Sequence, residues 1–195
     1  MAGILAPVAE PKRKATYDDL LAAPDNKVAE ILDGELILSP RPASPHERAS
    51  TVLLRLLSPF DPASDDPTLP GGWWIAVEPE IHLGADVVVP DLAAWRRERM
   101  PRIPNAPWHE LPPDWVCETL SPSTEQVDRG RKLRIYARAG VPHLWLVDPR
   151  VRTLEVFRRG EDGLYVLLAV HAGGERVRAE PFAAVEIELG RLWLD

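Results

Sequence analysis

The stretch that decides the fold comprises residues 115–148, WVCETLSPSTEQVDRGRKLRIYARAGVPHLWLVD. Its first part, 115–120, alternates side chains in the manner of a buried strand. The following segment, roughly 124–139, has helical spacing, and Gly140 and Pro142 mark its end. The apolar run 143–148 then predicts a second strand. This order of elements indicates a mixed α/β (α+β) domain built around one sheet.

Segments on both sides of this stretch add further elements. The runs VAEIL and ELIL around Asp33-Gly34 predict a β-hairpin with a tight turn. Residues 73–83, for which a bend at Pro79 is an open alternative, and residues 87–95 predict two more strands. The apolar runs after 148 predict a closing series of mostly hairpin-connected strands. Two short motifs predict the beginning of a helix. One is Thr16 with Asp19 three residues later. The other is Ser44-Pro45-His46-Glu47, where Ser44 is expected to cap the helix and Glu47 to complete a capping box.

Composition narrows the class of protein. The chain has 195 residues, 45% of them apolar and 27% charged, which is ordinary for a globular domain. We expect a tail over 1–15 and a single domain over 16–195. No apolar run is long enough to span a membrane. The single cysteine, Cys117, excludes an internal disulfide, and a cytoplasmic location is the default expectation. The net charge of −7 argues against non-specific coating of nucleic acid, although it leaves room for a local basic groove.

Two acidic residues stand where a buried strand should be apolar. Strand alternation puts Glu118 on one face with Val116 and Leu120, and it puts Asp91 on one face with Val89. A buried carboxylate is costly unless it is paired, protonated or bound to a metal. If both acids face one cleft, a divalent cation with a preference for oxygen ligands resolves the repulsion. The alternative is that each acid lies at a strand end and pairs with an arginine.

Lys132 is unusual because basic residues elsewhere in the chain are mostly arginine. On its helix, Asp128, Lys132 and Tyr136 share one face at four-residue spacing. A strand–loop–helix unit can bring Lys132 back over the end of the strand that carries Glu118. The alternative is an ordinary surface pair between Lys132 and Asp128.

Several strings of residues resemble one known family. They are VPDL (89–92), ETLSPST (118–124), DRGRKL (128–133) and YARAGVP (136–142), with AEILDGEL (29–36) upstream and WLVDP (145–149) downstream. Together they resemble the Uma-two family, whose members are restriction-type endonucleases of the PD-(D/E)XK superfamily. The resemblance covers about residues 16–192.

The resemblance implies a restriction-endonuclease-like core with a mixed central sheet flanked by helices and extra C-terminal antiparallel strands. It implies that Asp91 and Glu118 bind Mg²⁺ (or Mn²⁺), and that Lys132 supplies the catalytic cation. Leu120 occupies the place where the parent superfamily has its lysine; the family resembles those members in which the lysine lies on the next helix, and Lys132 fits that position. Glu30 and His46 match family positions and are expected as auxiliary residues near the same cleft.

The expected substrate is DNA. Phosphodiester hydrolysis needs an activated water and stabilisation of charge on the phosphate, which a metal and Lys132 would supply. Clustered arginines that include Arg96, Arg97, Arg129 and Arg131 are candidates for a phosphate-facing groove, or else belong to a solvated loop and an outer helix face. A homodimer is also expected, because restriction-type nucleases often cut two strands with two subunits. Two other functions stay open: a catalytically silent DNA-binding module, and a structural or oligomeric protein with paired acids.

Overall fold

The larger of two main sheets forms the body of the protein. The computed structural model describes residues 13–41, 43–63 and 66–193. This sheet has six strands in the order β10–β9–β8–β7–β6–β3. Their bounds are β3 (Trp73–Val77), β6 (Leu92–Arg96), β7 (Trp115–Thr119), β8 (His143–Asp148), β9 (Thr153–Arg159) and β10 (Tyr165–Ala172). Strands β7 and β8 run parallel and the other neighbours antiparallel, so the sheet is mixed, as the sequence predicts.

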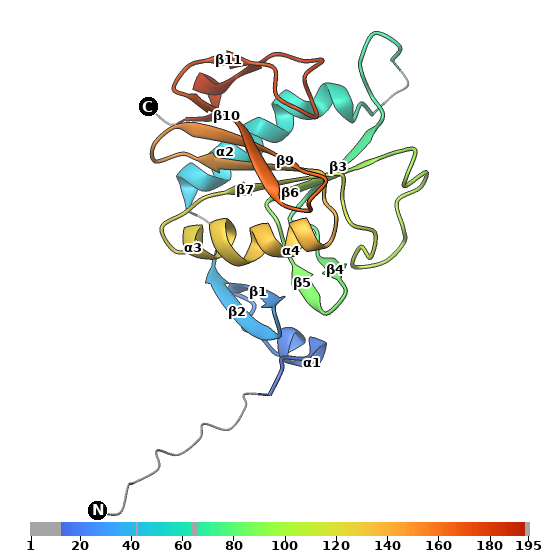
Figure 1. Cartoon of the computed structure of the whole chain (residues 1–195), viewed down its shortest axis with the longest axis vertical. Helices are drawn as coiled ribbons and strands as arrows, with labels where there is room; N and C mark the ends of the chain where they lie inside the picture. Colours follow the sequence, from blue (N-terminus) through green and yellow to red (C-terminus); the bar gives the residue numbers. More distant parts are fainter. Residues whose placement is uncertain (1–12, 42, 64–65, 194–195) are drawn as a thin grey trace, which may run out of the picture.

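A smaller sheet of four strands lies beside the larger one, close to helix α4 in Figure 1. Its order is β2–β1–β5–β4, with β1 (Lys27–Leu32), β2 (Glu35–Pro40), β4 (Ile81–Leu83) and β5 (Asp86–Val88). The predicted hairpin is confirmed as β1–β2. Asp33 and Gly34 both have positive φ, 53° and 82°, which is the conformation that a tight two-residue hairpin turn requires.

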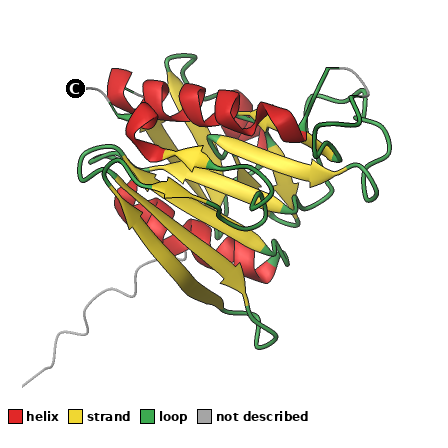
Figure 2. Cartoon of the chain, turned by 90° about the horizontal axis from the view of Figure 1, so that it is seen from above, coloured by secondary structure: helices red, strands yellow, loops and turns green. Residues whose placement is uncertain are grey.

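Helices cover both faces of the larger sheet (Figure 2). Helix α2 (Ser44–Leu57) packs over one face, where Trp115 and Cys117 of β7 point into its core. On the other face lies a helical segment made of α3 (Glu125–Val127), a π-helical turn (Asp128–Lys132) and α4 (Leu133–Arg138). Val116 points to that side. The predicted alternation of β7 is therefore confirmed, and it aims Glu118 toward the helix that carries Lys132.

The remaining elements are short. Helix α1 (Tyr17–Leu21) covers the smaller sheet, and Thr16 caps it with the predicted capping box to Asp19. The C-terminal segment holds β11 (Arg176–Val177), β12 (Ile187–Glu188) and a 3₁₀ turn (Leu189–Leu192), and a second 3₁₀ turn (Ser58–Phe60) follows α2. Of the predicted tail, residues 1–12 lie outside the described residues. Ala15 already donates a backbone hydrogen bond to Gly34, so the folded part begins before residue 16.

Two predicted strands are broken in the structure. The run 87–95 divides into β5 and β6, which belong to different sheets, and Asp91 lies in the bend between them. Pro90 explains the break, because proline has no N–H to donate to a sheet ladder. The run 73–83 likewise divides into β3 and β4 at Glu78, whose φ is 45°. Asp91 is therefore placed by a bend and not by strand alternation.

Two helix predictions also need correction. Ser44 is the first residue of α2 and not its cap; the cap is Ala43, whose carbonyl accepts from the Glu47 amide, and no side chain caps the helix. The predicted helix over 124–139 is interrupted by the π turn at Asp128–Lys132. Among the described residues, no helix is long and apolar enough to cross a membrane.

Candidate active site

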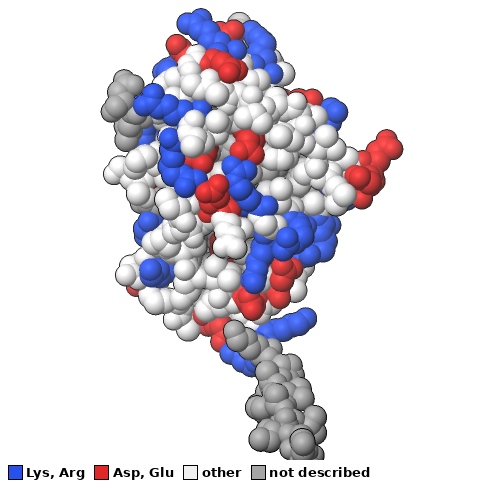
Figure 3. Space-filling model, turned by 60° about the vertical axis from the view of Figure 1, so that its left-hand side comes forward, with Lys and Arg blue, Asp and Glu red and all other residues white. Residues whose placement is uncertain are grey.

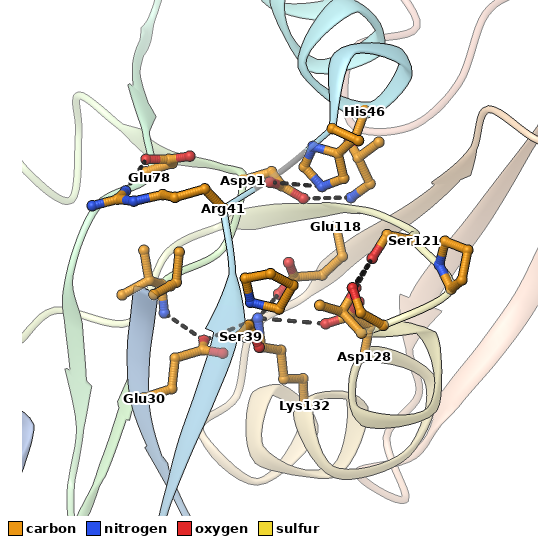
Figure 4. Close-up of a pocket in the computed structure, with 18 residues that line it drawn as sticks. Glu30, Ser39, Arg41, His46, Glu78, Asp91, Glu118, Ser121, Asp128 and Lys132 are labelled. Atoms are coloured by element: carbon orange, nitrogen blue, oxygen red, sulfur yellow. Dashed lines mark hydrogen bonds and ion pairs between the residues drawn. The ribbon is translucent and has the colours of Figure 1, made fainter. Parts of the chain in front are cut away.

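A pocket of about 340 Å³ opens where the two sheets meet the beginning of α2 and the π turn. All five catalytic and auxiliary residues predicted from the sequence line this pocket (Figure 4): Glu30, His46, Asp91, Glu118 and Lys132. They come from β1, α2, the β5–β6 bend, β7 and the π turn respectively. Residues spread over a hundred positions of the chain are thus brought to one place.

Lys132 lies at the centre of the charged groups. Its Nζ is 2.9 Å from Glu30 Oε1, 3.2 Å from Glu118 Oε1 and 3.5 Å from Asp128 Oδ1. Its side chain is only 6% exposed. Burial alone would lower the pKa of Lys132, but the carboxylates of Glu118, Glu30 and Asp128 raise that pKa well above its usual value. Lys132 is therefore a buried, protonated ammonium, and the surface-pair alternative is wrong.

Glu118 is held by two donors on one oxygen. Its Oε1 accepts a 2.6 Å hydrogen bond from the Tyr136 hydroxyl and also faces Lys132 Nζ. Burial raises the pKa of Glu118 well above its usual value, and although Lys132 lowers it, the carboxylates of Asp128, Asp91 and Glu30 raise it further. The Glu118 side chain also lines the pocket, where a ligand can reach it.

Asp91 and Glu30 are fixed by backbone amides. Asp91 Oδ2 accepts a 2.6 Å bond from the Thr119 amide, and its Oδ1 lies 3.2 Å from His46 Nε2. Glu30 Oε1 accepts a 2.8 Å bond from the Val89 amide in addition to its contact with Lys132. His46 Nδ1 is buried without a hydrogen-bond partner. Glu30 and His46 therefore lie in the same pocket as Asp91 and Glu118, and their auxiliary roles there stay predictions.

The pocket carries more negative than positive charge. Glu30, Asp91, Glu118 and Asp128 face it with one buried ammonium, that of Lys132. Burial raises the pKa of Glu30 as well, so holding all these acids ionised is costly. A cation bound among them would remove much of this cost. Within the described ranges, however, no three or more His, Cys, Asp or Glu side chains are close enough to form a metal cage.

The bond from Tyr136 to Glu118 makes a testable contribution to stability. Replacing Tyr136 by phenylalanine is expected to lower the free energy of unfolding by about 1.5–3 kcal/mol, because the bond lost is to a charged group in the interior. Tyr165→Phe is the matched control, since its hydroxyl donates to a neutral backbone carbonyl, that of Val141, at 2.8 Å. Urea unfolding of both variants measures the difference; equal losses would contradict the prediction.

The four candidate DNA-binding arginines do not line the pocket. Arg96 and Arg97 stack on Trp73 and Trp74 at the far end of β3 and β6. Three of the four pair with acids: Arg97 with Asp61 at 3.0 Å, Arg129 with Glu155 at 2.6 Å, and Arg131 with Glu35 at 2.6 Å. Positive and negative side chains lie side by side on the face in Figure 3, not in a tract of one sign. The structure does not bring these arginines to the candidate active site.

Sequence reasoning missed three features of the pocket. The π turn was not predicted, although Gly130 inside it is a poor helix former and was a readable signal. Such turns are frequent at functional sites, and this one carries both Asp128 and Lys132. Arg41 and Glu78 also line the pocket. Nothing in their local sequence identified them, because each lies in a connection whose position depends on the packing of both sheets.

Comparison with known proteins identifies the class and then the family. Comparison with curated proteins found no match. Among solved structures, the chain is similar to a crystal structure from Anabaena variabilis ATCC 29413 described as "a putative nuclease belonging to DUF820", with 22% identity and a TM-score of 0.70. The similarity covers 91% of this chain and 97% of that one, so the two proteins share a nuclease-type α+β fold.

The family is identified from the sequence. Residues 15–191 match the family model Uma2 (Uma-two), described as "Putative restriction endonuclease". Because the match covers nearly the whole chain, the protein belongs to the Uma2 family. Family membership and fold together support a nuclease-type function for the protein.

Proposed function

We propose that the protein is a metal-dependent endonuclease that hydrolyses phosphodiester bonds of DNA in this pocket. The observation that carries the proposal is the buried Lys132 ammonium, which lies within 3.5 Å of three carboxylates. A purely structural role explains the arrangement poorly, since buried ion clusters are weak sources of stability. Catalytic sites, in contrast, commonly hold charged groups with strongly perturbed pKa values.

The residues fit a magnesium or manganese ion. Mg²⁺ is usually held by one or two carboxylates, with the other positions filled by water and substrate phosphate. Asp91 and Glu118 would be those two ligands. A site of this kind needs only two protein carboxylates. It is therefore compatible with the lack of a group of three metal-binding side chains among the described residues. When bound, the ion would lower the pKa of a water molecule and stabilise charge on the phosphate.

The protein groups each have a task in this proposal. Lys132 would donate to the attacking water or to a phosphate oxygen. Its longest contact, 3.5 Å to Asp128, is the one most easily exchanged for such a bond. Tyr136 and the Thr119 amide would orient Glu118 and Asp91 through the oxygens that they already contact. Glu30 would hold Lys132 in place, and His46 would orient Asp91.

The proposal is tested by a cleavage assay on supercoiled plasmid, linear duplex and single-stranded DNA. Cleavage is expected with Mg²⁺ or Mn²⁺, and no cleavage is expected with EDTA or with Glu118→Ala purified in parallel. DNA binding without cleavage by the wild-type protein would instead indicate a silent nuclease-fold module. Absence of both cleavage and calorimetric Mn²⁺ binding would indicate paired structural acids.

A homodimer belongs to the same proposal. One pocket of this kind hydrolyses one strand at a time, so a double-strand cut needs two pockets, which two chains would supply. Light scattering on the purified protein, with and without DNA, measures this directly. A monomer under both conditions that still makes double-strand cuts would contradict it.

A further inference from the structure

Two cationic side chains line the pocket, and they differ in exposure. Lys132 is 6% exposed, whereas the Arg41 side chain is 57% exposed. Arg41 follows the last residue of β2, and Figure 4 shows its guanidinium pointing toward Glu78 at the edge of the group of pocket residues. Among the described pocket-lining residues, Arg41 is thus the cation that a ligand arriving from solvent can reach first.

The guanidinium of Arg41 is only partly engaged. Its Nη2 donates to the backbone carbonyl of Asp25 at 3.2 Å. Its Nη1 lies 3.8 Å from Glu78 Oε2, which is too long for a hydrogen bond. By comparison, Arg129 and Arg131 contact their acidic partners at 2.6 Å. The contact between Arg41 and Glu78 is therefore loose, and a stronger acceptor that reaches the rim of the pocket can replace it.

Glu78 is fixed beside Arg41 by the backbone. Its φ of 45° is uncommon for a residue with a side chain, and its amide donates a 3.0 Å bond to the Asp91 carbonyl. The same bend that separates β3 from β4 thus sets the position of a carboxylate next to Arg41. Left-handed backbone at such a residue costs energy, and residues strained in this way cluster at active sites and ligand-binding sites.

The pocket and its rim would repel a DNA strand without a compensating cation. Five carboxylates line it, those of Glu30, Glu78, Asp91, Glu118 and Asp128. A metal between Asp91 and Glu118 would compensate the phosphate being cleaved, but not the phosphates on either side of it. An arginine fork matches phosphate oxygens well and can bind them through two parallel hydrogen bonds.

We propose that Arg41 binds a DNA phosphate adjacent to the one that is cleaved, and that Glu78 competes with this phosphate for the guanidinium. This inference rests on the proposed nuclease function and adds a substrate-binding residue to it. In the free protein Glu78 holds the guanidinium loosely at the rim. In the complex the phosphate replaces Glu78, so each strand that binds must displace a weak ion pair.

Binding of a fluorescein-labelled single-stranded oligonucleotide tests this, measured by anisotropy over a range of salt concentrations. Ca²⁺ replaces Mg²⁺ so that binding is followed without turnover. Arg41→Gln is expected to weaken binding several-fold and to reduce the slope of log K against log salt by about 0.7, the contribution of one phosphate contact on a single strand. Glu78→Gln is expected to tighten binding several-fold.

Two controls separate this contact from general charge effects. Arg176→Gln removes an arginine of similar exposure, 65%, which also has a loose partner, Glu186 at 3.6 Å, and does not line the pocket. It should bind like the wild type; a loss equal to that of Arg41→Gln would overturn the proposal. In the Arg41→Gln background, Glu78→Gln should tighten binding less than it does in the wild type, because it then relieves only the repulsion between Glu78 and the strand. If Glu78→Gln tightens binding equally without Arg41, the competition is overturned.

The outcomes distinguish this inference from the function on which it rests. Wild-type protein that binds and cleaves DNA, with Arg41→Gln unchanged in affinity and salt slope, would overturn the role of Arg41 and leave the nuclease proposal standing. Wild-type protein that neither binds the oligonucleotide at low salt nor cleaves DNA would overturn both.

Discussion

Replacing Lys132 by methionine is expected to abolish DNA cleavage and to lower the free energy of unfolding by about 3–5 kcal/mol. Methionine is apolar and close to lysine in length, so it fills the space without the charge. Glu30, Glu118 and Asp128 would then lose the ammonium that each contacts within 3.5 Å. Cleavage should fall by about 10²–10³-fold or more, the usual cost of removing one group that stabilises transition-state charge.

A second variant separates catalysis from folding. Glu30→Gln/Lys132→Met removes one of the stranded carboxylates while keeping an oxygen that can accept from the Val89 amide. It should recover part of the lost stability without recovering cleavage. Lys132→Arg should rescue cleavage poorly, because the guanidinium is larger and planar. Urea unfolding in EDTA and plasmid cleavage measure the two effects. Full cleavage by Lys132→Met would show that Lys132 is only structural.

The position of Lys132 was readable from the sequence because it depends on local geometry. Alternation along β7 aims Glu118 to one face, and a short loop returns the next helix over that face. Four-residue spacing then places Asp128, Lys132 and Tyr136 on the side of the helical segment that faces the sheet. There Lys132 contacts Glu118 and Asp128, and Tyr136 donates a hydrogen bond to Glu118. Local rules of this kind need no knowledge of distant segments.

The position of Asp91 could not be predicted from local rules of this kind. The sequence predicts that strand alternation aims it, but Pro90 ends the ladder, and Asp91 is positioned by a bond from the Thr119 amide of a different strand. The arginines show the same dependence on distant segments. Arg129 and Arg131 are candidates either for a phosphate-facing groove or for an outer helix face, and each meets a glutamate far away in the sequence, Glu155 and Glu35. Pairings over such separations depend on the complete fold.

The sequence predicts Lys132 beside Asp128 and over the end of the strand that carries Glu118, but it does not predict how deeply the side chain is buried. In the structure Lys132 contacts Glu30, Glu118 and Asp128 and is almost fully buried, so the loss of its charge is costly. Glu30 itself was expected nearby only through the family resemblance. Its contact with Lys132 joins the smaller sheet to the helix on the larger one, so Lys132 also contributes to packing between the sheets.

Replacing Glu118 by glutamine is expected to abolish cleavage and metal binding while leaving the metal-free protein as stable as the wild type, or more stable. Glutamine keeps an oxygen that can accept from Tyr136, and it removes a buried charge close to Asp128, Asp91 and Glu30. Lys132 keeps its two other acidic partners. The variant therefore separates metal binding from folding more cleanly than any change at Lys132.

The measurement is thermal or urea unfolding with and without Mn²⁺, together with calorimetric titration of Mn²⁺. A ligand that binds only the folded state stabilises it by about 2.7 kcal/mol at one hundred times its dissociation constant. Wild-type protein should show this gain and Glu118→Gln should not. Glu155→Gln is the matched control, because Glu155 is a mostly buried glutamate that pairs with Arg129 and does not line the pocket, so its response to Mn²⁺ should be that of the wild type. If Glu118→Gln gains as much stability from Mn²⁺ as the wild type does, Glu118 is not a metal ligand.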